Sequence, residues 1–191
     1  MQTPLAQPAG VTICADDYGL APGVSRAIQS LVGLGRLSAV SCMTGFPEWP
    51  TEARRLKDLD ADVDIGLHLV LSDLPATGTM PRTAPGGRLP GLARLLVDSH
   101  LGMLALAEIE EEMNRQLDAF EASMGRRPDF IDGHRHVHSL PGVRNLVVAL
   151  FETRLDKGNT WLRVCSSSRR EIIGRGHSGG HALPQALLID Q

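Results

Sequence analysis

Short apolar runs alternate along the chain with segments whose apolar residues recur every three or four positions. The short runs are rich in strand-forming residues and predict strands at residues 11–15, 37–43, 63–69, 129–133 and 161–165. The periodic segments predict one helix from Pro22 to about Gly33 and others over residues 48–59, 108–124 and 143–151. This alternation is typical of an α/β fold built on parallel strands.

Two segments stand out from this alternation. The helix at 108–124 carries an apolar stripe that indicates core packing, formed by Ile109, Met113, Leu117, Phe120 and Met124. Residues 72–91 are rich in proline and glycine and predict a loop that is too long for a simple turn. Loops of this length often have a function, although a surface insertion without a role fits the pattern equally well.

Composition narrows the class of protein. The 191 residues are 42% hydrophobic, which suits a single domain over residues 1–191, and the net charge of −3 with no basic patch argues against a nucleic-acid partner. No apolar run approaches the roughly 18 residues of a membrane span, and the first ten residues do not resemble a signal peptide. The separated Cys14, Cys42 and Cys165 predict buried thiols rather than disulfides. We therefore expect a cytoplasmic protein.

The polar residues that could carry chemistry lie near the ends of predicted strands. Asp16 and Asp17 follow the first strand, His68 lies near the end of its strand, and Asp132 and His134 close another. The carboxyl ends of parallel strands meet at one edge of a sheet or barrel, where functional residues gather. These five side chains are therefore candidates for one site.

The adjacent carboxylates of Asp16 and Asp17 allow two interpretations. A turn or a helix cap would explain them without any chemistry, because aspartate suits both positions. Alternatively, one carboxylate ligates a metal ion while the other acts as a base, a division that metal-assisted hydrolysis requires. His68 is equally open: a lone strand histidine is commonly a core residue, but this one shares its strand face with Asp64 and Gly66.

Residues 132–138 (DGHRHVH) hold an unusual density of histidines. If this segment is extended, the side chains of Asp132, His134, His136 and His138 point the same way. Imidazole is a common metal ligand, and carboxylates or further histidines can orient a ligand histidine. Spacing alone does not choose between His134 and His138 as the ligand. His177 and His181 lie in a glycine-rich stretch and are expected to be loop residues.

Four segments together resemble the YdjC-like family of carbohydrate deacetylases, which includes the chitooligosaccharide deacetylases. They are residues 15–28 (ADDYGLAPGVSRAI), 37–43 (LSAVSCM), 64–72 (DIGLHLVLS) and 126–143 (RRPDFIDGHRHVHSLPGV). They occur in the family's order and spacing over about the first 165 residues. The tail from Ser166 is similar to that of the hopanoid-biosynthesis-associated branch of the family.

The resemblance implies a (β/α) barrel-like fold and a divalent metal ion held by Asp17, His68 and His134, with Asp16 as catalytic base. It thereby selects His134 over His138 as a ligand. Two histidines and one aspartate accept several divalent ions, of which we expect magnesium or zinc. The implied reaction is hydrolytic removal of an acetyl group from a small N-acetylated carbohydrate, with a water molecule as nucleophile.

The chain departs from the family at its C-terminal end. Family members carry a further histidine late in the chain as the general acid, and we find no matching motif before Gln191. We therefore expect an incomplete or C-terminally truncated barrel. An open barrel exposes sheet edges and apolar surface, which favours a homo-oligomer. Metal binding should survive such a truncation better than turnover does.

Two other functions remain open at this point. The first is a metal-dependent phosphoesterase or amidohydrolase, although the histidine cluster of those enzymes usually follows the first strand, where this chain has Asp16 and Asp17. The second is a non-catalytic metal-binding protein that is accessory to a sugar phosphotransferase system. Metal content and acetate release together distinguish these possibilities from a deacetylase.

Overall fold

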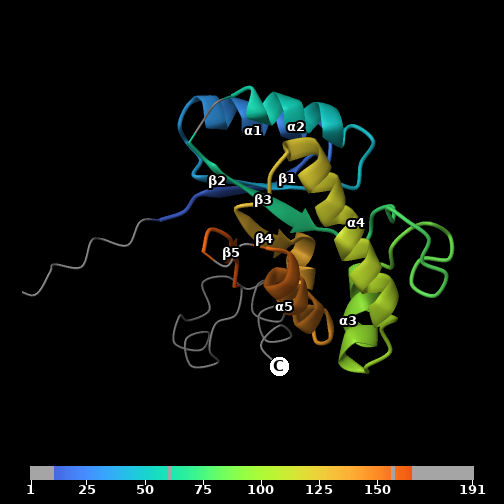
Figure 1. Cartoon of the computed structure of the whole chain (residues 1–191). Coiled ribbons are helices and arrows are strands. Elements are labelled where there is room, and N and C mark those ends of the chain that lie inside the picture. Colours follow the sequence, from blue (N-terminus) through green and yellow to red (C-terminus); the bar gives the residue numbers. More distant parts are fainter. Residues whose placement is uncertain (1–10, 60–61, 156–157, 165–191) are drawn as a thin grey trace, which may run out of the picture.

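A computed structural model describes residues 11–59, 62–155 and 158–164 of the chain. Within these ranges, five parallel strands form one sheet whose spatial order is the order along the chain (Figure 1). The strands are β1 (Cys14–Tyr18), β2 (Ala39–Cys42), β3 (Asp64–Leu69), β4 (Phe130–Gly133) and β5 (Trp161–Leu162). This is the sequential strand order of a (β/α) barrel. The predicted α/β class is confirmed, and the sheet of the described residues is open rather than closed into a barrel.

Helices connect successive strands. They are α1 (Pro22–Gly33), α2 (Trp49–Lys57), α3 (Leu92–His100), α4 (Leu106–Met124) and α5 (Val143–Arg154), with a short 3₁₀ segment, η1 (His134–Ser139). Pro22 occupies the first position of α1, and Gly125 ends α4 with a left-handed backbone (φ 71°). None of the helices in these ranges is both long and apolar enough to cross a bilayer.

The core lies between the sheet and the helices that follow its strands. The predicted stripe of α4 is fully buried, which confirms its role in packing. On α2, the ring of Trp49 stacks on Phe120 with centroids 5.8 Å apart, and its indole N–H donates to the carbonyl of Ala119 at 2.9 Å. These contacts fix α2 against α4, the helix that also contacts β3.

Three local predictions were wrong. The first strand begins and ends about three residues later than predicted, so that Asp16 and Asp17 lie inside β1 rather than after it. The helix α3 was not predicted, because its apolar residues surround the helix: Leu95 is buried while Val97 is 56% exposed. Residues 134–139 form the turn η1 instead of an extended segment. The last predicted strand is β5, and Cys165 lies outside the described residues.

Candidate metal centre

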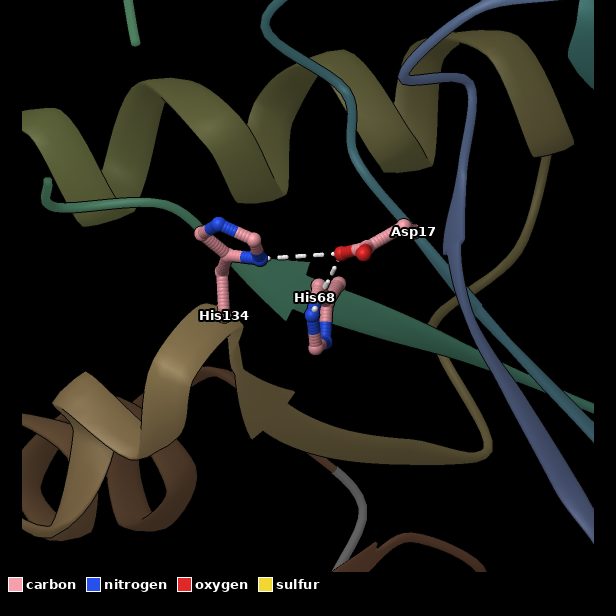
Figure 2. Close-up of side chains that lie close together, drawn as sticks. All are labelled: Asp17, His68 and His134. Carbon is pink, nitrogen blue, oxygen red and sulfur yellow. Dashed lines mark hydrogen bonds and ion pairs between the residues drawn. The ribbon is translucent and has the colours of Figure 1, made fainter. Parts of the chain in front are cut away.

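The three predicted ligands come from two strands and from the residue that follows a third, and they meet at the carboxyl edge of the sheet (Figure 2). Asp17 lies in β1, His68 near the end of β3, and His134 directly after β4. His134 Nδ1 lies 2.9 Å from Asp17 Oδ1, and His68 Nε2 lies 3.2 Å from the same oxygen. One donor atom from each residue falls within 4.8 Å of the others. The structure therefore brings together the set that the sequence predicted.

An irregularity in β1 aims Asp17 at this point. The pairing of β1 with β2 shifts between Ala15 and Tyr18, and Asp17 has a left-handed backbone (φ 66°). Aspartate tolerates this conformation better than most residues, and a bulge re-aims the side chain that it carries. The strict alternation of a strand is broken here, and the adjacent carboxylates of Asp16 and Asp17 consequently meet different partners.

His68 is held from behind by a buried carboxylate. Its Nδ1 lies 2.7 Å from Asp132 Oδ1 and 3.0 Å from the hydroxyl of Ser41 on β2, which also donates to Asp132. His68 and Asp132 are direct partners in the β3–β4 register, and both side chains are almost completely buried. Because Nδ1 is engaged by Asp132, the ring directs Nε2 toward Asp17. A carboxylate behind a ligand histidine is the usual second layer of a metal site.

The charges in the site stabilise one another. Burial opposes the charged form of His68, but its hydrogen bonds with Asp132 and Asp17 raise its pKa to about 9. The hydrogen bond from His68 is the largest influence on Asp17 and lowers the pKa of that carboxyl. For Asp132, burial raises the pKa, and hydrogen bonds from His68, Ser41 and Arg163 more than offset it, so that the pKa is lowered. The carboxylates of Asp17 and Asp132 and the imidazole of His68 thus favour one another's charged forms.

Asp16, the predicted base, lies in a second cluster built around Arg163. Nη1 of Arg163 lies 2.8 Å from Asp16 Oδ1 and 2.9 Å from Asp132 Oδ2, so that one guanidinium bridges the two carboxylates. The thiol of Cys14 donates to Asp16 at 3.4 Å. Cys14, Asp16 and Asp132 also place donor atoms within 4.8 Å of one another. The arginine cation already compensates the carboxylates of that group, whereas the carboxylate of Asp17 is paired with the imidazoles of His68 and His134.

The histidines of the 134–138 cluster do not point the same way, contrary to the extended geometry predicted for them. Arg135 and His136 have left-handed backbones (φ 53° and 60°), which turn the chain sharply after His134. His138 Nε2 instead donates to the carbonyl of Arg163 at 3.0 Å, and burial lowers the pKa of His138. His138 therefore supports the arginine of the second cluster, and His134 is the histidine that meets Asp17.

Two residues of the site were not predicted from the sequence. The sequence pattern predicted Ser41 only as part of a strand. A hydroxyl within an apolar run could have indicated a buried polar contact. Arg163 directly follows β5 and therefore lies at the carboxyl edge of the sheet, as the predicted site residues do. Its place at the end of a predicted strand was the signal that could have indicated it. His177, His181 and the tail from Ser166 lie outside the described residues.

The donor atoms that converge here suit a divalent metal ion. One carboxylate and two imidazoles form a common three-ligand set, which leaves coordination positions for water and substrate. The buried Asp132 behind His68 supplies the outer partner that such ligands normally have. The residues present therefore fit the implied metal, and Asp17, His68 and His134 are the ones that would hold it.

Comparison with known proteins shows the family to which the chain belongs. The model of the family described as YdjC-like protein matches residues 10–187. The chain therefore belongs to the YdjC-like family, as the sequence motifs predicted. The assignment to the hopanoid-biosynthesis-associated branch is not tested by these comparisons and stays a prediction.

Curated relatives of the chain carry related names. A carbohydrate deacetylase of Mus musculus is 31% identical over 140 residues, which is 70% of this chain and 44% of the relative. A carbohydrate deacetylase of Geobacillus stearothermophilus is 32% identical over 139 residues (72% and 54%). A chitooligosaccharide deacetylase of Yersinia pestis is 33% identical over 136 residues (71% and 53%). The chain thus spans about half the length of these relatives.

A solved structure confirms the fold. The crystal structure of a candidate cellobiose-phosphate cleavage protein from Enterococcus faecalis matches with a TM-score of 0.66 and 24% identity. The match covers 83% of this chain and 60% of the other.

Proposed function

We propose that the chain binds one divalent metal ion through Asp17, His68 and His134 and removes an acetyl group from an N-acetylated carbohydrate. The observation that carries the proposal is the convergence of these three donors next to a separate carboxylate, Asp16, that Arg163 holds. Amide hydrolysis by a metal site needs a ligand set with open positions and a base that is not itself a ligand. The names of the curated relatives supply the substrate class.

A metal ion held there would polarise the acetyl carbonyl, lower the pKa of the attacking water and stabilise the oxyanion that forms. Asp16 accepts the proton of that water as its oxygen bonds to the carbonyl carbon. The carbon–nitrogen bond then breaks, and the amine leaves with the proton that Asp16 returns, which yields acetate and a free amino sugar. Arg163 keeps Asp16 in place through its ion pair.

The surrounding residues prepare the site for this reaction. The buried Asp132 and Ser41 hold His68 in one orientation, and the left-handed Asp17 turns its carboxylate toward both histidines. A site whose ligands are already oriented needs little rearrangement when it binds substrate. Zinc suits the two imidazoles, and magnesium is the other ion that we expect to support the reaction.

Acetate release measures this function directly. The full chain is stripped with a chelator, reloaded with zinc or magnesium and incubated with N-acetylated chitooligosaccharides. We expect metal-dependent acetate release that the Asp17→Ala and His134→Ala variants lose and the Asp118→Asn variant keeps. Asp118 is a suitable control because its carboxylate is 63% exposed and lies on α4 outside the site.

The other possible results separate the competing functions. Metal binding without acetate release from any N-acetylated saccharide would contradict the deacetylase and favour a non-catalytic protein. Phosphate release from a sugar phosphate would favour a phosphoesterase. A chain that takes up no metal would contradict the site itself.

A further inference from the structure

The loop at residues 72–91 is held firmly against α4. Three residues of α4, spaced by four positions, receive hydrogen bonds from the loop or from Val70, two positions before it. Gln116 exchanges two hydrogen bonds with the backbone of Val70, and Glu112 accepts from the N–H and hydroxyl of Thr77. Glu108 accepts from the N–H groups of Arg82 and Thr83. These hydrogen bonds hold the loop in one position against α4, directly after the end of β3.

The same loop also contacts the segment that carries the predicted ligand His134, through Asp73. Oδ2 of Asp73 lies 3.1 Å from Nη1 of Arg135, the residue that directly follows the predicted ligand His134. Asp73 itself lies five positions after His68. The ion pair thus joins the two segments that carry the histidine ligands, at the carboxyl edge of the sheet.

Both residues of this pair have unusual backbones. Asp73 (φ 62°) and Arg135 (φ 53°) are left-handed although neither is glycine. Such a conformation is unfavourable for residues other than glycine and persists where the surroundings enforce it, commonly at ligand sites. The hydrogen bonds from the loop to α4 hold the loop that contains Asp73 in place.

Arg135 keeps donors for a ligand. A guanidinium has five N–H donors, and the ion pair with Asp73 engages Nη1. The Arg135 side chain is 47% exposed, in contrast to the buried His68 nearby. Because the Asp73 carboxylate compensates its charge, the guanidinium favours neutral oxygen acceptors, such as hydroxyl and carbonyl groups, over an anion.

We propose that Arg135 is a substrate-binding residue that donates hydrogen bonds to the oxygens of a neutral saccharide, and that Asp73 positions it. This inference rests on the proposed function, and it takes Arg135 because this residue directly follows the predicted ligand His134 in the chain. The pair sets KM and the preference between neutral and anionic saccharides. It leaves metal binding and the chemical step to Asp16, Asp17, His68 and His134.

Kinetics and calorimetry with N-acetylated chitooligosaccharides test this role. Loss of a charged hydrogen-bond donor typically weakens binding about ten- to hundredfold. We expect Arg135→Ala to raise KM and the saccharide Kd by that factor, to change kcat less than KM and to leave zinc affinity unaltered. Arg135→Lys should restore part of the loss. Arg94→Ala is the matched control, since Arg94 forms an exposed ion pair with Asp98 on α3.

Asp73→Asn supplies an independent test, because it leaves the guanidinium without its counter-charge. We expect the ratio of kcat/KM values to shift from the neutral saccharide toward one that carries a uronate. A melting temperature close to that of the unaltered chain shows that the loop has kept its fold. Unchanged KM and Kd in Arg135→Ala would overturn the proposal, as would a loss of zinc affinity that accounts for the whole effect.

Failure of this proposal is distinguishable from failure of the proposed function. Acetate release with an unchanged KM in Arg135→Ala contradicts the role of Arg135 alone. Saccharide binding without acetate release contradicts the deacetylase, and a weakened Kd in Arg135→Ala would then still support the binding role. A chain that neither binds nor hydrolyses N-acetylated saccharides contradicts both.

Discussion

His68 and Asp132 are register partners on adjacent parallel strands, with the imidazole Nδ1 2.7 Å from the carboxylate Oδ1. The pair is buried, and its orientation presents Nε2 of the same ring to Asp17. The strand pairing itself therefore sets the direction of a predicted metal ligand. The site therefore depends on Asp132 of β4 as well as on the three ligands themselves.

The Asp132→Asn variant tests this dependence. Asparagine keeps the size of the side chain but removes the charge that orients His68, and changes to such outer partners cost about ten- to hundredfold in metal affinity. We expect zinc affinity to fall by that factor in a calorimetric titration, whereas Asp118→Asn should bind zinc as the unaltered chain does. Equal affinities in the two variants would show that Asp132 does not orient the ligand.

The proposed base, Asp16, should affect the rate of acetate release, whereas the three ligands should affect the affinity for zinc. Asp16→Asn removes the proposed proton acceptor without touching Asp17, His68 or His134. Because general base catalysis contributes roughly 10²–10⁴-fold, we expect kcat for acetate release to fall by that factor. Zinc affinity should stay within about threefold, which is less than 1 kcal/mol of binding free energy. A large loss of zinc affinity in this variant would make Asp16 a ligand rather than a base.

Cys14 should be a poorly reactive thiol. Burial and the neighbouring Asp16 raise its pKa to about 12, and burial also raises the pKa of Cys42. At pH 8 the thiolate fraction of Cys14 is then roughly 10⁻⁴, against about one-tenth for an ordinary thiol with a pKa near 9. In a Cys165→Ser chain we expect iodoacetamide to alkylate Cys14 slowly, and mass spectrometry measures the rate of that alkylation. The Asp16→Asn substitution should accelerate the alkylation of Cys14, because it removes the neighbouring negative charge. Rapid alkylation of Cys14 in a chain that keeps Asp16 would contradict the contact between the two side chains.

Gly133 is required by its closeness to His138. A Cβ atom added at Gly133 would lie 2.8 Å from the His138 ring and 3.0 Å from its backbone nitrogen, which cannot move without shifting η1. We expect Gly133→Ala to lower the free energy of unfolding by about 1–3 kcal/mol in urea denaturation. Gly23→Ala is the control, since an added Cβ there meets nothing within 4 Å. Equal stability of the two variants would show that the turn tolerates a side chain.

The sequence predicted much of this arrangement because parallel strands place their carboxyl ends together. Short apolar runs located all five strands, the first of them about three residues too early, and the polar residues near their ends gave five candidates for one site. The family resemblance then named Asp17, His68 and His134 as the ligands, and these are the residues that the structure brings together. The choice of His134 over His138 required the family resemblance. Spacing could not make that choice because it depends on the left-handed turn at Arg135 and His136, which no hydrophobic pattern records.

Other features depend on contacts between distant residues. Arg163 meets Asp16 across 147 positions of sequence, and Asp73 meets Arg135 across 62. No pattern of neighbouring residues in the sequence predicts either of these ion pairs. Glu112 of α4 illustrates the same limit, because it is completely buried and accepts a hydrogen bond from the backbone N–H of Thr77, 35 positions away.

The most direct test of the central claim is the position of the metal itself. Crystals of the full chain grown with zinc, measured at the zinc absorption edge, locate the ion by its anomalous scattering. We predict one peak about 2.0–2.2 Å from a carboxylate oxygen of Asp17 and from one ring nitrogen each of His68 and His134. A peak at Cys14, Asp16 and Asp132 instead, or no peak at either group, would contradict the account.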